Sequence, residues 1–300
     1  MFTRRQLLAA GGAAASLSLS SSGFASDGLI SRTIPASGEQ LVAMGIGTNR
    51  YGVTGAEAKA PLKATLAEFV RLGGQLIDTA PSYGKGVSES VLGELTDELG
   101  IRDELFFATK VDGRMDGPRQ MATSLEKLKT DQAELIQVHN LRALDTLLPA
   151  LREAQTDGLI KYVGVTTSRH EQFEQLENVL RSEPLDFVQL NYSLDDRQAA
   201  DRLLPMAQER GIAVLVNLPF GRGRLFEKTA GQALPEWAAE FDCQTWGQFF
   251  LKYLLGHPAV TCPIPGTRKT KHVVDNMGAA MGAVPDEAMR KRQEALIDAL

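Results

Sequence analysis

Cysteine is scarce in this chain of 300 residues, which has only Cys243 and Cys262. Two cysteines are too few for a disulfide framework, and their spacing does not match that of a metal site. The sequence therefore excludes a small fold held together by disulfides, and it predicts no metal centre. One bridge in an oxidising compartment and two free thiols both remain compatible with it.

A strong excess of charge is also missing. The formal net charge is −5, and no basic stripe or alternation of basic and aromatic residues occurs that could neutralise a nucleic-acid backbone. We expect no nucleic-acid partner. Apolar residues make up 43% of the chain and charged residues 23%, which is typical of a globular protein with a large core. The length suits one α/β barrel with a short leader.

The first 26 residues differ from the rest and are predicted to be a signal peptide. Arg4 and Arg5 precede a stretch of small and apolar residues, 7–19, and small residues suited to a signal peptidase follow at 23–25. The stretch is shorter than the roughly 20 apolar residues of a membrane-spanning helix, so we expect no membrane span in the mature protein. The string Thr-Arg-Arg-Gln-Leu-Leu resembles a twin-arginine export signal, and the general secretory route is the alternative.

This leader predicts a periplasmic or exported protein that contacts the export machinery. A leader that does not function would leave the protein in the cytoplasm. Twin-arginine export carries folded proteins, which suits an enzyme that binds its nucleotide before it leaves the cytoplasm.

Short apolar runs alternate with longer amphipathic stretches over residues 27–300, which we predict to be one domain. Eight runs have the character of strands buried on both faces: 41–47, 75–79, 105–110, 134–139, 162–166, 187–190, 213–216 and 260–264. The helical patterns between and after them are 58–72, 88–99, 122–129, 144–155, 172–180, 199–209, 246–255 and 270–281. One more helix is predicted at 285–300. The order is β then α, repeated eight times.

Two α/β folds give this alternation, a closed (β/α)₈ TIM barrel and an open doubly wound sheet. The open sheet favours a glycine-rich fingerprint after the first strand, but residues 45–50 lack its final glycine and no helix follows directly. The barrel is therefore the predicted fold. Glycines that follow helical patterns fit helix C-terminal caps: Gly73, Gly74, Gly100, Gly158, Gly211 and Gly256.

Ionisable residues close three consecutive predicted strands. Asp78 ends the second, Lys110 the third and His139 the fourth, and Tyr83 lies shortly after Asp78. Each has an ordinary explanation taken alone: a turn cap, a solvated strand end, a core histidine, a half-buried ring. In an α/β barrel, however, the carboxyl ends of the strands form the active-site face. Together these residues predict a proton donor with the groups that tune it.

The chain resembles the aldo/keto reductase family in several ordered segments, between about residues 44 and 276. They are Asp78-Thr79-Ala80-Pro81-Ser82-Tyr83-Gly84 with Glu89 and Gly93, then Ala108-Thr109-Lys110, then His139. The resemblance implies a barrel enzyme that uses NADPH, with NADH less favoured, to reduce an aldehyde or ketone to an alcohol. The family's four catalytic residues correspond to Asp78, Tyr83, Lys110 and His139. None is missing.

The chemistry explains why these residue types are needed. Hydride arriving at a carbonyl carbon leaves negative charge on the oxygen, so the site needs a proton donor and groups that stabilise that oxygen. Tyr83 would supply the proton, and Lys110 would lower the tyrosine pKa from its usual value of about 10. Asp78 would hold and compensate Lys110. His139 would donate a hydrogen bond to the carbonyl.

The resemblance also implies a nucleotide-binding site along the later strands. The residues that correspond to it are Thr48, Thr166, Thr167, Gln189, Asn217, Gly221, Arg222, Gly223, Gly266, Thr267, Arg268, His272 and Asn276. Many relatives have Ser-Asn in place of Thr166-Thr167 and an aromatic residue in place of Asn217. The last segment could also be the basic first turn of a solvated helix.

Substrate choice is suggested by residues that differ from those of many relatives. Asn49 and Asn140 stand where many aldo/keto reductases have tryptophan, and Asn217 replaces the stacking aromatic. Amide groups need hydrogen-bond partners once water is displaced. We therefore expect a small polar carbonyl substrate, such as a hydroxyaldehyde or a sugar. The alternative function is a nucleotide-binding regulatory subunit of the same fold with little turnover.

Overall fold

A computed structural model describes residues 28–300 of the chain. The predicted signal peptide lies outside the described residues, so it stays a prediction. Among the residues described, no helix combines the length and the apolar character that crossing a membrane requires.

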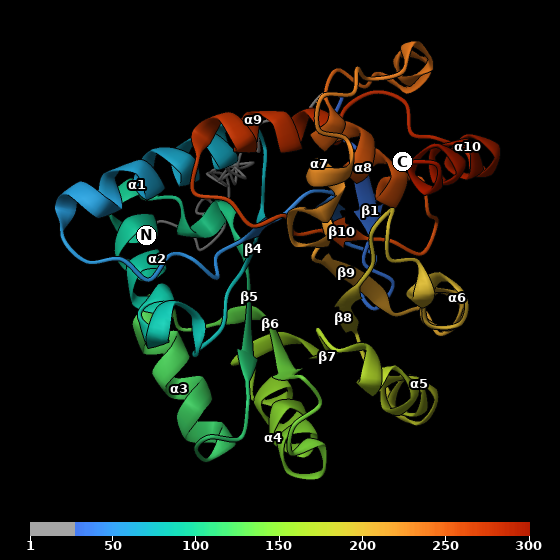
Figure 1. Cartoon of the computed structure of the whole chain (residues 1–300). Coiled ribbons are helices and arrows are strands. Elements are labelled where there is room, and N and C mark those ends of the chain that lie inside the picture. Colours follow the sequence, from blue (N-terminus) through green and yellow to red (C-terminus); the bar gives the residue numbers. More distant parts are fainter. Residues whose placement is uncertain (1–27) are drawn as a thin grey trace, which may run out of the picture.

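Eight parallel strands form a curled sheet (Figure 1). They are β3 (Ile46–Gly47), β4 (Leu76–Asp78), β5 (Phe106–Val111), β6 (Ala133–His139), β7 (Ile160–Thr166), β8 (Phe187–Asn191), β9 (Ala213–Asn217) and β10 (Cys262–Pro263). Their order in the sheet follows the sequence. A parallel bridge joins Gly47 to Gly266, and the amide of Gly45 donates to Pro263 O at 2.9 Å. These contacts join the first strand to the last, so the predicted (β/α)₈ TIM barrel is confirmed.

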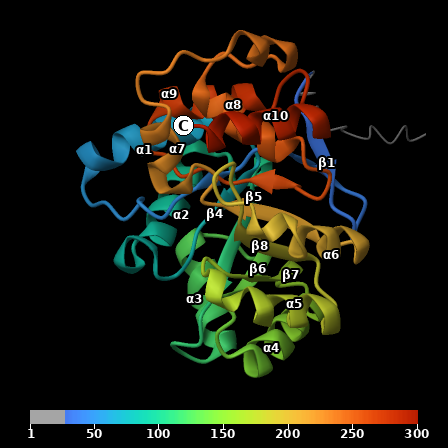
Figure 2. The ribbon, with the colours of Figure 1, turned by 45° about the vertical axis from the view of Figure 1, so that its right-hand side comes forward.

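Helices cover the outside of the sheet (Figures 1 and 2). They are α1 (Ala56–Arg71), α2 (Ser88–Leu99), α3 (Gly117–Leu128), α4 (Leu144–Thr156), α5 (Phe173–Ser182), α6 (Leu203–Glu209), α7 (Arg224–Lys228), α8 (Trp246–Leu255), α9 (Thr270–Ala279) and α10 (Glu287–Asp298). The predicted helices are all present, with ends shifted by a few residues. The short helix α7, in the connection from β9 to β10, was not predicted.

Gly93, one of the family-motif glycines, lies where α2 crosses α3 at close range. A Cβ at this position would lie 2.1 Å from Lys127 O. The packing of these two helices therefore requires a glycine here, independently of any catalytic role.

The first predicted strand, 41–47, is divided in the structure. Gln40–Val42 (β2) pairs with Ser31–Thr33 (β1) in a separate antiparallel sheet, and only β3 joins the barrel. Ile34 and Leu41 from this hairpin pack with the side chains that fill the barrel interior. An unbroken apolar run could not reveal the division, because both parts are buried.

Gly256 is an exception among the predicted helix caps. Gly73, Gly100, Gly158 and Gly211 have the positive φ of a left-handed cap, whereas Gly256 has φ −70°. A Cβ on Gly256 would lie 2.4 Å from Pro285 O. Gly256 is the C-terminal cap of α8, as predicted, but it is not left-handed, and the glycine is needed because the segment leading to α10 passes close to it.

The two cysteines are free thiols, and both are buried. Burial raises the pKa of Cys243 to about 12, and it raises the pKa of Cys262 as well. The structure therefore holds two unreactive thiols and no bridge between them.

Candidate active site

A buried ion pair lies at the carboxyl ends of the neighbouring strands β4 and β5. Lys110 Nζ lies 2.6 Å from Asp78 Oδ2 and donates to Thr79 O at 2.6 Å. Lys110 is 1% exposed and Asp78 2%. Burial alone would lower the pKa of Lys110, but the nearby Asp78 carboxylate and the Tyr83 side chain raise it overall. Lys110 therefore remains an ammonium group.

Tyr83 and His139 complete the group predicted from the sequence. Lys110 Nζ lies 4.9 Å from the centre of the Tyr83 ring. The Tyr83 and His139 rings meet edge to face, with centroids 6.2 Å apart and an interplanar angle of 82°. The structure thus brings all four predicted catalytic side chains together at one end of the barrel.

Burial decides the protonation of Tyr83. It raises the pKa of the phenol, and the Lys110 ammonium offsets this only in part. The lowering effect expected of Lys110 is present, but desolvation outweighs it, so the pKa of Tyr83 lies above its usual value. Tyr83 carries its proton at neutral pH.

His139 is neutral for related reasons. Burial, followed by the positive charge of Lys110, lowers its pKa to about 3. A neutral imidazole has one N–H to donate, which agrees with the role expected from the sequence.

A contact between two glycines holds the turn that carries Tyr83. Gly84 has φ 56°, and a Cβ on it would lie 2.3 Å from the Cα of Gly52 in the loop after β3. The two loops therefore rest backbone against backbone. Gly84 belongs to the family motif, but no sequence signal pointed to Gly52.

Hydrogen bonds within the protein engage several of the residues predicted to bind the nucleotide. Thr48 Oγ1 donates to Asp78 O at 2.8 Å, so this hydroxyl supports the ion pair. Thr167 Oγ1 donates to Gln172 Oε1 at 2.6 Å. Gln189 is buried on β8, next to Thr166 on β7, and its Oε1 accepts from Gln137 Nε2 at 2.9 Å. Gln137, on β6, was missed by the sequence analysis.

Asn217, at the end of β9, has one satisfied and one unsatisfied amide atom. Its Nδ2 donates to Thr167 O at 3.3 Å, while its buried Oδ1 has no hydrogen-bond partner among residues 28–300. The turn that follows has positive φ at Gly221, Arg222 and Gly223, with values of 56°, 58° and 102°. Within this turn the amides of Gly221 and Gly223 donate to Leu218 O and Phe220 O, both at 2.9 Å, so backbone hydrogen bonds hold its shape.

The last predicted nucleotide segment begins at the barrel closure. Gly266 bridges to Gly47 of β3, and Thr267 Oγ1 accepts from the amide of Lys269 at 3.1 Å. Arg268, Lys269 and His272 are exposed at the start of α9, whereas Asn276 is buried on the same helix. The cations and the helix N-terminus therefore lie together, as a phosphate site needs.

The predicted substrate residues lie in different surroundings. Asn49 is exposed in the loop after β3. Asn140 Oδ1 accepts from the amide of Ser168 at 2.9 Å, and its backbone oxygen accepts from Gln172 Nε2 at 2.9 Å. The Asn140 side chain thus ties the loop after β6 to the loop after β7. We expected the substrate to supply the hydrogen bonds of this amide, whereas the Ser168 amide already donates to its oxygen.

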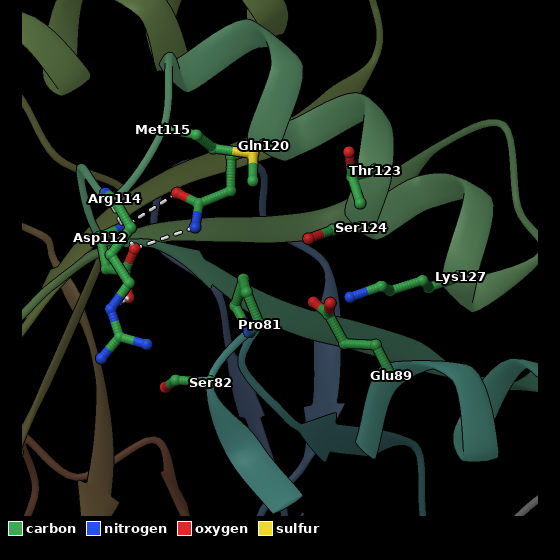
Figure 3. A pocket seen from close by; sticks show the side chains of 10 residues that line it. All are labelled: Pro81, Ser82, Glu89, Asp112, Arg114, Met115, Gln120, Thr123, Ser124 and Lys127. Atoms are coloured by element: carbon green, nitrogen blue, oxygen red, sulfur yellow. Dashed lines mark hydrogen bonds and ion pairs between the residues drawn. The ribbon is translucent and has the colours of Figure 1, made fainter. Parts of the chain in front are cut away.

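A cavity of about 140 Å³ lies beside the turn that carries Tyr83, between the ends of β4 and β5 and helix α3 (Figure 3). Glu89 is 1% exposed there; its Oε1 accepts from Thr109 Oγ1 at 2.7 Å, and its Oε2 has no partner within residues 28–300. Asp112 Oδ1 accepts from Gln120 Nε2 at 2.9 Å. Over the described range, no group of three His, Cys, Asp or Glu side chains is placed to bind a metal ion.

Residues 43–297 match the family model described as Aldo/keto reductase family. This chain belongs to the aldo/keto reductase family. It is 29% identical over 228 residues to Aldo-keto reductase YhdN of Bacillus subtilis (strain 168), covering 70% of this chain and 66% of that protein. It is 26% identical over 282 residues to L-galactose dehydrogenase of Arabidopsis thaliana, covering 83% and 87%.

The fold is also that of solved aldo-keto reductases. The structure of an aldo-keto reductase from Klebsiella pneumoniae in complex with NADPH gives a TM-score of 0.75 at 24% identity, covering 90% of this chain and 96% of that one. The family match confirms the prediction of an oxidoreductase.

We predict a measurable effect of His139 on stability in acid. In the unfolded chain its pKa returns to about 6.5, so unfolding takes up a proton that the folded protein accepts only near pH 3. The contribution of neutral His139 to the free energy of unfolding is present above about pH 6.5 and is lost as the pH falls. Between pH 7 and pH 5, the free energy of unfolding of the wild type should fall by about 2 kcal/mol more than that of His139→Gln, measured by urea denaturation. Equal falls would show that His139 is not held neutral.

Proposed function

We propose that this protein reduces aldehydes or ketones to alcohols, with hydride from NADPH and a proton from Tyr83. The carrying observation is the buried group in which Lys110 lies between the Asp78 carboxylate and the Tyr83 ring. The NADPH complex of the Klebsiella pneumoniae neighbour supports the choice of cofactor.

The residues present fit a nicotinamide nucleotide. Asn217 Oδ1 is buried without a partner among residues 28–300, and Gln189 is buried on the adjacent strand, so both suit a carboxamide. Arg268 and Lys269 have no carboxylate within ion-pair distance in the described part of the chain, so both suit a phosphate. When bound there, the nucleotide supplies the hydride.

Side chains of the protein donate the proton and stabilise the charge that its transfer leaves. Tyr83 keeps its proton until the carbonyl oxygen gains charge, and His139 donates a hydrogen bond to that oxygen. As the proton leaves, negative charge appears on Tyr83 beside Lys110. Two unit charges about 5 Å apart at an effective dielectric constant of about 20 interact by on the order of 3 kcal/mol. That corresponds to roughly a hundredfold in rate, so Lys110 acts mainly on the transition state.

A regulatory nucleotide-binding subunit remains the second candidate function. The four catalytic side chains, all present and in mutual contact range, favour the enzyme. The L-galactose dehydrogenase among the relatives is in keeping with a hydroxylated substrate.

Tyr83→Phe tests the central assignment. We expect kcat to fall by roughly 10²- to 10⁴-fold, the usual contribution of a general acid, while the Kd for NADPH stays unchanged. Tyr162→Phe is the matched control, because Tyr162 lies near the other end of the barrel beside Ser37 and Glu39. Near wild-type turnover of Tyr83→Phe would remove Tyr83 from the mechanism.

Arg268→Gln tests the preference for NADPH. A lost charge-assisted hydrogen bond to the 2′-phosphate should weaken NADPH binding by roughly ten- to a hundredfold. NADH binding should barely change, because NADH has no phosphate at that position. Fluorescence titration measures both constants, and Arg71→Gln, an exposed arginine paired with Glu68, is the control. An equal loss for both nucleotides would contradict the assignment.

The proposed export route depends on Arg4 and Arg5 in residues 1–26. Replacing both with lysine should leave precursor in the cytoplasm if the route is twin-arginine export, as measured by cell fractionation and blotting. Unchanged delivery to the periplasm would indicate the general secretory route.

A further inference from the structure

One half of the barrel mouth carries cations that the proposed nucleotide site does not use. We call it the β3–β6 rim: residues 48–55, 79–87, 112–116 and 140–143, the segments that follow β3, β4, β5 and β6. Its basic residues are Arg50, Lys85, Arg114 and Arg142, and its acidic residues are Asp112 and Asp116. The excess is local, since the whole chain has a net charge of −5.

Both acidic side chains of the rim already have partners within the protein. Asp116 caps α3, where its side chain accepts from the amide of Arg119 at 3.3 Å. Asp112 is buried and accepts from Gln120 Nε2 at 2.9 Å, and its second oxygen lies 3.1 Å from Arg114 Nε. The accessible charge of the rim is therefore positive.

The Arg114 guanidinium has hydrogen-bond donors that the described part of the protein does not use. Its Nε faces Asp112, whereas neither Nη atom donates a hydrogen bond among the residues described, and the side chain is 63% exposed. Figure 3 shows the guanidinium pointing away from Gln120, toward the side on which Ser82 lies. Ser82 directly precedes Tyr83 in the chain. A guanidinium with two free nitrogens matches a carboxylate or a phosphate.

Arg142 stands beside the candidate catalytic histidine on a loop of unusual geometry. Its amide donates to His139 O at 3.4 Å. Leu141 and Ala143, on either side of it, both have positive φ, at 53° and 49°. Such backbone is strained for residues other than glycine and persists only where the surroundings hold it. The hydrogen bond that the Ser168 amide donates to Asn140 Oδ1 is one such restraint.

The potential of both arginines reaches the reacting end of the barrel. After burial and Lys110, which lower the pKa of His139, Asp112 raises it, and Arg142 and then Arg114 lower it by smaller amounts. The two cations therefore lie close enough to act electrostatically on a group bound against the imidazole.

We propose that Arg114 and Arg142 bind an anionic group, a carboxylate or a phosphate, that the substrate carries a few bonds from its carbonyl. The inference rests on the proposed function, because it takes the carbonyl to lie against Tyr83 and His139. It narrows the substrate class to small carbonyl acids or carbonyl phosphates.

Matched substrate pairs test this. Butanal and 4-oxobutanoate differ by a carboxylate, and glyceraldehyde and glyceraldehyde 3-phosphate differ by a phosphate. With NADPH at low ionic strength, we expect the anionic member of at least one pair to have a kcat/KM at least about tenfold higher, as one charged hydrogen bond predicts. The advantage should shrink as salt is added. The pair that shows it identifies the anion.

Arg114→Gln and Arg142→Gln should each reduce this advantage by about tenfold, whereas Arg292→Gln on α10, which removes the same charge far from the mouth, should not. Succinate, a dicarboxylate without an aldehyde or ketone group to reduce, gives a measurement independent of turnover. Its Kd for the NADPH-loaded protein, from calorimetry, should rise in both rim variants. Arg142→Lys should restore part of the binding.

Equal kcat/KM within both pairs, with succinate binding unaffected by either substitution, would overturn the proposal. Turnover of the neutral aldehydes would then still support the reductase function. A protein that reduces none of the four compounds would contradict the proposed function instead, and succinate binding would still decide the role of the two arginines.

Discussion

The ion pair between Lys110 and Asp78 is the constraint to which the rest of the site responds. Moving an ion out of water costs several kcal/mol, and only close partners offset it. Lys110 has two, Asp78 Oδ2 and Thr79 O, both at 2.6 Å. The register of the barrel strands supplies these partners. Asp78 lies opposite Ala108 on β5, and Lys110 follows two residues later on the same face as Ala108. The Lys110 side chain can therefore reach back across the strand end to Asp78. Without parallel strands ending together, the pair would not form.

Tyr83 and His139 take their protonation states from this buried setting. Desolvation disfavours the charged form of any group, so it keeps Tyr83 a phenol and His139 a neutral imidazole. Lys110 opposes the first effect and strengthens the second. The result suits carbonyl reduction, since the acid holds its proton in the resting state and the ammonium stabilises charge only as that proton departs. A solvated lysine in the same place would act far more weakly.

The order of the elements and the gathering of Asp78, Tyr83, Lys110 and His139 at one end of the barrel were predictable, because strand ends in a barrel converge and the Asp78-to-Gly84 motif is specific. What the sequence could not reveal depends on contacts between distant segments. Gly52 matters only because Gly84 rests on it. The net pKa shift of Tyr83 depends on how deeply the ring is buried. The sequence alone does not show a partner for the Asn140 amide. In the structure its Oδ1 accepts a hydrogen bond from the Ser168 amide, in a loop where Asn140 has positive φ.

Both halves of the mouth place glycine and other residues at backbone positions of positive φ. The nucleotide half uses Gly221 and Gly223 for two of its positive-φ positions, where glycine avoids a steric clash at the expense of a more flexible unfolded chain. The rim uses Gly84 and Gly86 in the same way, whereas its loop after β6 has Leu141 and Ala143 at positive φ, which cost about 1–2 kcal/mol each in this conformation. Leu141 is 5% exposed, and burying a leucine side chain contributes about 1.5–3 kcal/mol. Its packing thus offsets its own strain, and a glycine there would remove both together. A loop built this way fixes the backbone that carries the exposed side chain of Arg142.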